Sequence, residues 1–140
     1  MKAFAFAAVC VFTGLIAVAY IPHSGAMADS GLVGNWTGVV THQQRYIVVT
    51  LTVNTLQLGR ISGDMRWGTP RACSLQTEYS GTYDGRYAFN IAGSNGGWCD
   101  MYRDGSLSVE MHQQQPRSLS FTLADRQGGG VVEGHLATEP

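Results

Sequence analysis

From Asn35 onward, apolar and polar residues alternate with a period of two in one short segment after another, and no segment shows the period of a helix. Residues 45–53 are the clearest example, because every second residue from Ile47 to Val53 is apolar. Such alternation is typical of β-strands that bury one face and expose the other. The chain is therefore expected to fold as an all-β domain.

Turn signals separate these segments, and they indicate about nine short strands. Asp84-Gly85 and Asp104-Gly105 each lie between two alternating runs, and both dipeptides favour the tight turns of hairpins. Sequential hairpins without long crossovers predict an antiparallel meander. Closing that meander into an up-and-down β-barrel of eight or nine strands, with the last strand beside the first, removes both exposed edges. A small β-sandwich is the alternative.

Two segments of this meander have features of their own. Residues 58–67 are expected as a strand with Ile61, Met65 and Trp67 on one side and a bend or bulge at Gly63. Residues 98–102 are expected as a short strand after a glycine-rich loop. No helix is expected.

The first 28 residues have the three parts of a secretory signal peptide: Lys2, an uncharged run over residues 3–21, and a small-x-small triplet ending at Ala28. We expect residues 1–28 to be a signal peptide and residues 29–140 to be a single domain. The uncharged run is also long enough for an uncleaved membrane anchor. Both alternatives place the domain outside the cytoplasm, so we expect a periplasmic or secreted protein.

Two cysteines, Cys73 and Cys99, follow the signal segment. An even pair in a small exported domain predicts a disulfide, with two buried free thiols as the alternative. In a meander, the strands that carry these cysteines begin at the same end of the barrel and have one strand between them, which is too far for a direct bridge. A disulfide therefore requires the loop at residues 93–97 to fold over that end and carry Cys99 inward.

The charge balance bears on the partner. Lys2 is one of nine basic residues, so eight arginines stand against ten acidic residues after the signal segment. Without a basic run, neither nucleic acid nor, after signal cleavage, a membrane surface is an expected partner.

His42, His112 and His135 are far apart in the sequence and lack metal-ligand spacing, and no nucleophile motif is present. We therefore expect no metal, no cofactor and no catalytic site.

Two tryptophans and one arginine are the candidate binding residues. Trp67 ends one predicted strand, Arg71 lies in the loop after it, and Trp98 directly precedes Cys99. In the barrel, all three are expected at the mouth that carries the disulfide, where they would line a ligand entrance or form a protein-binding hot spot. The alternative is that both tryptophans only fill the core.

The triplet Gly34-Asn35-Trp36 opens the first predicted strand. A G-x-W at this position of a short meander barrel resembles the calycin superfamily, which includes the lipocalins and avidins. The resemblance rests on these residues and on the regular spacing of the predicted strands, and it implies that Trp36 closes one end of the barrel. The other tryptophan positions that line an avidin pocket have no counterpart here, so the resemblance does not imply biotin binding.

These features predict a non-catalytic binding protein outside the cytoplasm that holds an unidentified small apolar or amphipathic ligand at the disulfide-stapled mouth. The alternative is a periplasmic protein-binding module, such as an inhibitor of, or an immunity protein against, an exported hydrolase. An enclosed pocket of hundreds of Å³ would favour the small ligand. A barrel filled by its own side chains would favour the protein partner.

Overall fold

The computed structural model describes residues 31–113 and 116–138, and the expected signal segment, residues 1–28, lies outside them. Eight strands follow one another along the chain: β1 (Gly34–His42), β2 (Arg45–Val53), β3 (Ile61–Trp67), β4 (Cys73–Tyr83), β5 (Arg86–Ser94), β6 (Ser106–His112), β7 (Ser118–Ala124) and β8 (Val132–Thr138). A 3₁₀-helix, η1 (Gly97–Tyr102), lies between β5 and β6. Within this described part, no helix is long and apolar enough to cross a membrane.

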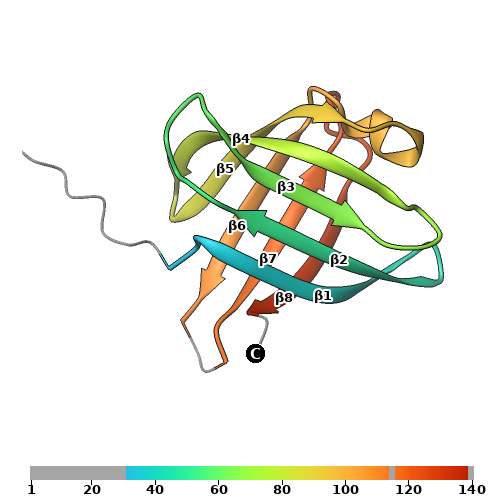
Figure 1. Ribbon diagram of the computed structural model, residues 1–140, viewed down its shortest axis with the longest axis horizontal. Coiled ribbons are helices and arrows are strands. Elements are labelled where there is room, and N and C mark those ends of the chain that lie inside the picture. The colour runs from blue at the N-terminus through green and yellow to red at the C-terminus, as the bar shows by residue number, and fades with distance from the viewer. Residues whose placement is uncertain (1–30, 114–115, 139–140) are drawn as a thin grey trace, which may run out of the picture.

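Each strand pairs antiparallel with the next, and β8 returns to pair with β1, so the sheet is a closed barrel (Figure 1). The closing ladder joins Trp36 to Thr138 and Thr37 to Ala137. The predicted all-β meander and its closure are confirmed, and the β-sandwich alternative is wrong. An eight-strand antiparallel barrel of this kind is compatible with the calycin architecture.

The predicted strand at residues 98–102 is wrong, because these residues belong to η1. Gly96 and Gly97 have φ angles of 106° and 64°, and this backbone turns the chain out of the extended conformation that β5 follows. The segment is also not needed to complete the sheet, since β5 pairs directly with β6. The barrel therefore has eight strands, and a helical turn lies over one of its ends.

The predicted bulge in β3 is confirmed, because the register with β4 shifts between Ile61 and Gly63. A bulge reverses which face the residues beyond it occupy. Met65 and Trp67 are buried, whereas Ile61 is 45% exposed, so the prediction that Ile61 lies on their side of the strand is wrong. The Asp84-Gly85 turn is also confirmed, with the positive φ angles of 51° and 76° that a type I′ turn requires.

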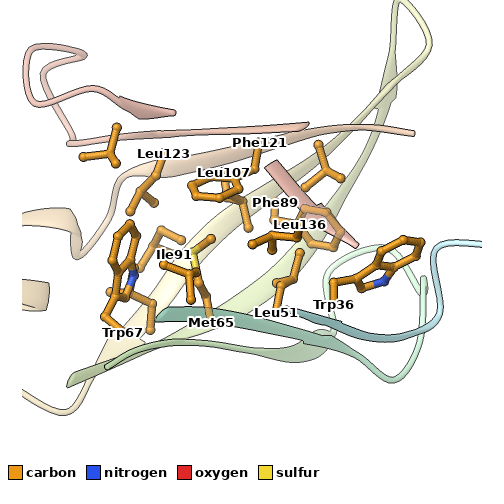
Figure 2. Packing of buried hydrophobic residues seen from close by; sticks show 14 of the residues in the cluster. Trp36, Leu51, Met65, Trp67, Phe89, Ile91, Leu107, Phe121, Leu123 and Leu136 are labelled. Atoms are coloured by element: carbon orange, nitrogen blue, oxygen red, sulfur yellow. The ribbon is translucent and has the colours of Figure 1, made fainter. Parts of the chain in front are cut away.

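Inward-facing side chains from all eight strands fill the barrel with one hydrophobic core (Figure 2). Trp67 and Trp36 lie at opposite ends of the row of core side chains in Figure 2. Trp36 is 1% exposed, and its indole Nε1 donates a hydrogen bond to the backbone oxygen of Leu32 at 2.8 Å. The two ends of the barrel are therefore covered by different sets of residues, and the disulfide lies at the Trp67 end.

Candidate functional site

The end of the barrel that carries the disulfide, here called the stapled mouth, is formed by four connections. These are the β1–β2 turn, the β3–β4 loop at residues 68–72, η1, and the β7–β8 loop at residues 125–131 (Figure 1). Alternate turns of a meander lie at the same end of a barrel, so segments that are far apart in the sequence meet here. The opposite mouth carries the β2–β3, β4–β5 and β6–β7 connections.

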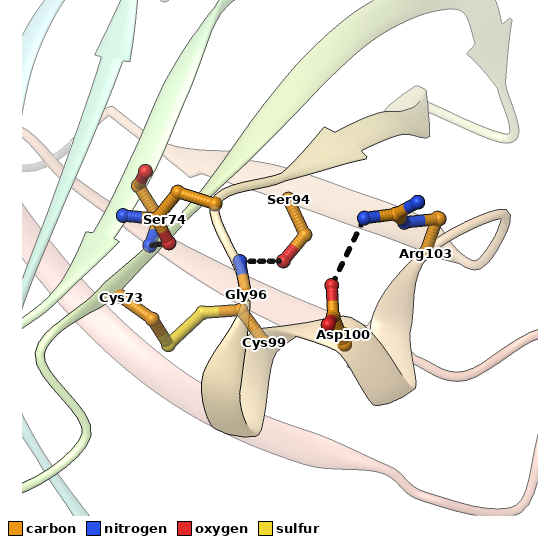
Figure 3. A network of polar contacts seen from close by, with 8 residues as sticks. Cys73, Ser74, Ser94, Gly96, Cys99, Asp100 and Arg103 are labelled. Carbon is orange, nitrogen blue, oxygen red and sulfur yellow. Dashed lines mark hydrogen bonds and ion pairs between the residues drawn. A yellow bond between two sulfur atoms is a disulfide. The ribbon is translucent and has the colours of Figure 1, made fainter.

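The Cys73–Cys99 disulfide fixes η1 to the first residue of β4, which confirms the predicted pairing (Figure 3). The two Cα atoms are 5.9 Å apart, and both cysteines are buried. Before the helix, the backbone nitrogen of Gly96 donates to Ser94 Oγ at 3.0 Å. As predicted, the loop before Cys99 folds over the barrel end, so the residues of η1 are held in place across the mouth.

Trp98, the second residue of η1, lies at the centre of an aromatic cluster. Its ring centroid is 4.9 Å from that of Trp67 and 4.9 Å from that of Tyr102, both in edge-to-face geometry. The His42 ring, from the end of β1, lies 5.4 Å away. Trp67 and Tyr102 are buried, while Trp98 and His42 are half-buried. Aromatic pairs at these distances favour a single rigid arrangement of the mouth.

Arg71 completes the cluster from the β3–β4 loop. Its guanidinium carbon lies 4.8 Å from the centre of the Trp98 ring, within the range of a cation–π contact. Its Nη2 donates to Gln43 Oε1 at 2.7 Å and lies 3.4 Å from His42 Nδ1. Its Nε is buried and has no hydrogen-bond acceptor among the described residues. The loop is itself held by the backbone oxygen of Gly68, which accepts hydrogen bonds from the Arg71 backbone nitrogen at 3.0 Å and from the next residue.

The surroundings at the stapled mouth shift the pKa of two ionisable groups. Burial, and then the positive charge of Arg71, lower the pKa of His42 below its ordinary value of 6.5. Burial and the negative charge of Asp125 raise the pKa of Tyr102, and Arg71 opposes them. At neutral pH both side chains are therefore uncharged, and the His42 ring is able to accept a hydrogen bond from Arg71.

The lowered pKa of His42 gives stability a pH dependence. The folded protein favours the neutral imidazole of His42. The contribution of this group to the free energy of unfolding is therefore fully present above about pH 6.5, the pKa in the unfolded chain, and is lost as the pH falls through the pKa in the folded protein. We expect a larger drop in unfolding free energy between about pH 7.5 and about pH 5.5 for the native chain than for His42→Asn, measured by urea denaturation. An equal drop in both would contradict the role of His42.

Three open hollows lie on the outer surface of the barrel. The largest, about 510 Å³, crosses the outer face of β3 and β4 beside Asp64 and Arg66. A second, about 320 Å³, shares Arg66 with the first and continues to Cys73. The third, about 180 Å³, lies across β6 to β8 beside His135. Trp67 of the aromatic cluster lines the second hollow together with Cys73, whereas Arg71 and Trp98 line none of the three.

The structure brings together the three predicted binding residues, Trp67, Arg71 and Trp98, at the mouth that carries the disulfide. Three neighbours were not predicted as part of this cluster: His42, Gln43 and Tyr102. The meander offered a signal for the first two, because the β1–β2 turn and the β3–β4 loop lie at the same end of such a barrel. Sequence alternation carries no comparable signal for Tyr102, whose place depends on η1.

In the described part of the chain, the histidines and carboxylates do not gather into a metal site. Among the residues of the described ranges, no group of three or more His, Cys, Asp or Glu side chains could hold a metal ion. On the outer face, His112 Nε2 lies 3.0 Å from Ser120 Oγ, and the His112 and His135 ring centroids are 6.4 Å apart. This pair lies toward the opposite mouth, away from the aromatic cluster.

No protein-family model, no curated protein and no solved structure matches this chain. The site at the stapled mouth is therefore described by its own geometry alone.

Proposed function

We propose that this chain is a non-catalytic binding domain that works outside the cytoplasm and binds another protein through the stapled mouth. One observation carries the proposal: Trp98 is held between Arg71, His42 and Trp67 on a helical turn that a disulfide fixes to the barrel. Tryptophan and arginine are the residue types that most often dominate the binding energy of protein interfaces. A turn that is already rigid loses little conformational entropy when a partner binds.

The mouth also offers apolar surface for such an interface. Met101 is 55% exposed on η1, three residues after Trp98. Side chains three residues apart lie on the same face of a 3₁₀-helix, so Met101 and Trp98 extend one surface. A flexible methionine beside a fixed aromatic ring suits contact with another protein surface.

The filling of the barrel favours a protein partner over the small ligand expected from the sequence. Core side chains occupy the barrel from Trp67 to Trp36, and the three hollows described above are open to the outer surface. A partner that covers the mouth from outside needs no interior space. An inhibitor of an exported hydrolase, or an immunity protein against one, fits this mode of binding.

A small ligand at the mouth is the second candidate, and one observation favours it. The indole Nε1 of Trp67 is buried, and the part of the chain that the structure describes offers it no hydrogen-bond acceptor. A buried donor without a partner is unfavourable by about 1–3 kcal/mol, and a small molecule with a carbonyl or hydroxyl oxygen would supply the acceptor. Mass spectrometry of small molecules that copurify with the native chain separates the two candidates.

The location outside the cytoplasm rests on two features. The first 28 residues have the composition of a signal peptide, and the Cys73–Cys99 disulfide is of the kind that persists in oxidising compartments. We infer export to the periplasm or the medium. N-terminal sequencing of the protein from fractionated cells tests this inference, and the expected first residue is Asp29.

The proposed binding surface predicts a difference between the two mouths. Met101→Glu places a charge on the exposed surface of η1 and is expected to weaken partner binding at least about tenfold with little change in stability. The matched control is Tyr83→Glu, because Tyr83 is 63% exposed at the opposite mouth. Affinity for a partner captured from periplasmic extract is the measurement. Equal affinities for the two variants would contradict the proposal.

A further inference from the structure

We propose that the stapled mouth recognises a carboxylate group of its protein partner, and that Arg71 is the residue that binds it. This inference rests on the proposed function and names the chemistry of the partner. It starts from the charge of Arg71, which is half-buried at the mouth. Within the described chain its side chain contacts uncharged groups only: Gln43, the neutral ring of His42, and Trp98.

No carboxylate in the described chain balances that charge. The described ion pairs all use other arginines, and they are Arg66–Asp64, Arg86–Glu110 and Arg103–Asp100. A guanidinium that is partly removed from water usually has a carboxylate or phosphate partner. The unbalanced charge of Arg71 therefore indicates that its counter-ion comes from another molecule.

Asp125, whose charge acts on Tyr102 as that of Arg71 does, is already engaged by its own loop. Its Oδ1 accepts hydrogen bonds from the backbone nitrogens of Gln127 and Gly129, both at 2.9 Å, and its Oδ2 accepts one from Gly130 at 2.7 Å. These hydrogen bonds, that from Gly129 first, lower the pKa of Asp125. The carboxylate thus serves as the fixed centre of the β7–β8 loop and is not the partner of Arg71.

The geometry of Arg71 suits a carboxylate from outside. Stacking on Trp98 and the 2.7 Å hydrogen bond to Gln43 hold the plane of the guanidinium in place before any partner arrives. Within the described chain, Nη2 carries the hydrogen bonds, Nη1 makes none, and Nε has no acceptor. Because Nε is buried and Nη2 already contacts Gln43 and His42, Nη1 is the donor that is open to a carboxylate from outside. A charged hydrogen bond to a guanidinium that is already held in place costs little entropy.

The neighbours of Arg71 favour a carboxylate that stands next to an apolar side chain. Trp98 borders the guanidinium, the exposed Met101 lies three residues after it on η1, and Arg71 makes the described cation–π contact with the Trp98 ring. A phosphate group carries nearly two negative charges and is usually bound by clusters of cations and backbone amides. The C-terminal residue of a partner, or an acidic side chain beside an apolar one, matches this surface.

Three peptide probes test the inference. Acetyl-Gly-Gly-Phe with a free carboxylate is compared with its C-terminal amide, and acetyl-Gly-Asp-Phe-amide carries the charge on a side chain instead. Binding is followed by the indole N–H signals of Trp36, Trp67 and Trp98 in NMR spectra of the native protein. Trp36 lies at the opposite mouth and donates to Leu32, so its signal serves as the internal reference.

We expect at least one carboxylate probe to shift the Trp98 signal and to bind about tenfold or more tightly than the amide, the range of a charged hydrogen bond. The probe that binds identifies the source as a chain terminus or an acidic side chain. Arg71→Gln is expected to remove the preference for carboxylate. Arg71→Lys keeps the charge without the planar fork and is expected to keep only part of the preference. Arg45→Gln, which changes an exposed arginine at the same mouth, is the control and is expected to keep it all.

Equal binding of the carboxylate and amide probes, or a preference that survives Arg71→Gln, would overturn the inference. Failure of this inference differs from failure of the proposed function. If Met101→Glu still blocks the partner while the probes show no preference, protein binding at the mouth stands and only the carboxylate is wrong. If Met101→Glu has no effect, the mouth itself is wrong.

Discussion

Replacing Trp36 with alanine is expected to lower the free energy of unfolding by about 3–5 kcal/mol, the range for removing a large aromatic side chain from a core. Trp36 is 1% exposed at the opposite mouth, in the ladder that closes β1 against β8. The substitution leaves a cavity there and also removes the indole that donates to Leu32. Urea denaturation measures the change. Tyr83→Ala, at an exposed position of the same mouth, is the control, and its expected change is within about 0.5 kcal/mol. A loss below about 1 kcal/mol for Trp36→Ala would show that this end is not a packed part of the core.

Removing the disulfide by Cys73→Ala together with Cys99→Ala is expected to destabilise the domain by about 2–5 kcal/mol. The bridge closes a loop with a sequence separation of 26 residues, so its loss gives the unfolded chain more conformational freedom. Alanine is the better replacement because both positions are buried and a serine hydroxyl there would need an acceptor. The same loss is expected for the native chain in reductant. Equal denaturation midpoints with and without reductant would contradict the structural role of the bridge.

The sequence predicted the barrel because its strands are regular where they bury one face. The alternation from Ile47 to Val53 in β2 determines which residues face the core, and the short turns leave only neighbouring strands to pair with. Gly63 marked the bulge in β3, since a side chain there would collide with the backbone carbonyl of Thr52 on β2. At these positions the local sequence preferences agree with the overall fold, so the sequence pattern alone was sufficient to predict the structure.

The region between β5 and β6 could not be predicted in the same way. A short segment such as residues 98–102 does not distinguish a strand from a helical turn by periodicity. Its conformation depends on the left-handed backbone of Gly96 and Gly97 and on the distant Cys73. The turn after η1 also lies one residue earlier than predicted. Asp104 has a φ of 62°, and the Gly105 nitrogen donates to the Tyr102 oxygen at 2.9 Å.

The candidate site was predictable in position but not in composition. The meander and the cysteine pair place Trp67, Arg71 and Trp98 at one mouth, and the structure agrees. That Arg71 stacks on Trp98, and that His42 lies beside both, depends on side-chain packing between segments far apart in the sequence. Such packing leaves no trace in local periodicity.

Site-specific photo-crosslinking tests the central claim, that a protein partner binds at the stapled mouth. A benzoyl-phenylalanine is placed at position 101 in one variant and at position 83 in another, because Met101 and Tyr83 are similarly exposed at opposite mouths. After irradiation in whole cells, a discrete protein adduct is expected from position 101 and none from position 83. An adduct from position 83 alone would contradict the claim and move the binding surface to the other end of the barrel.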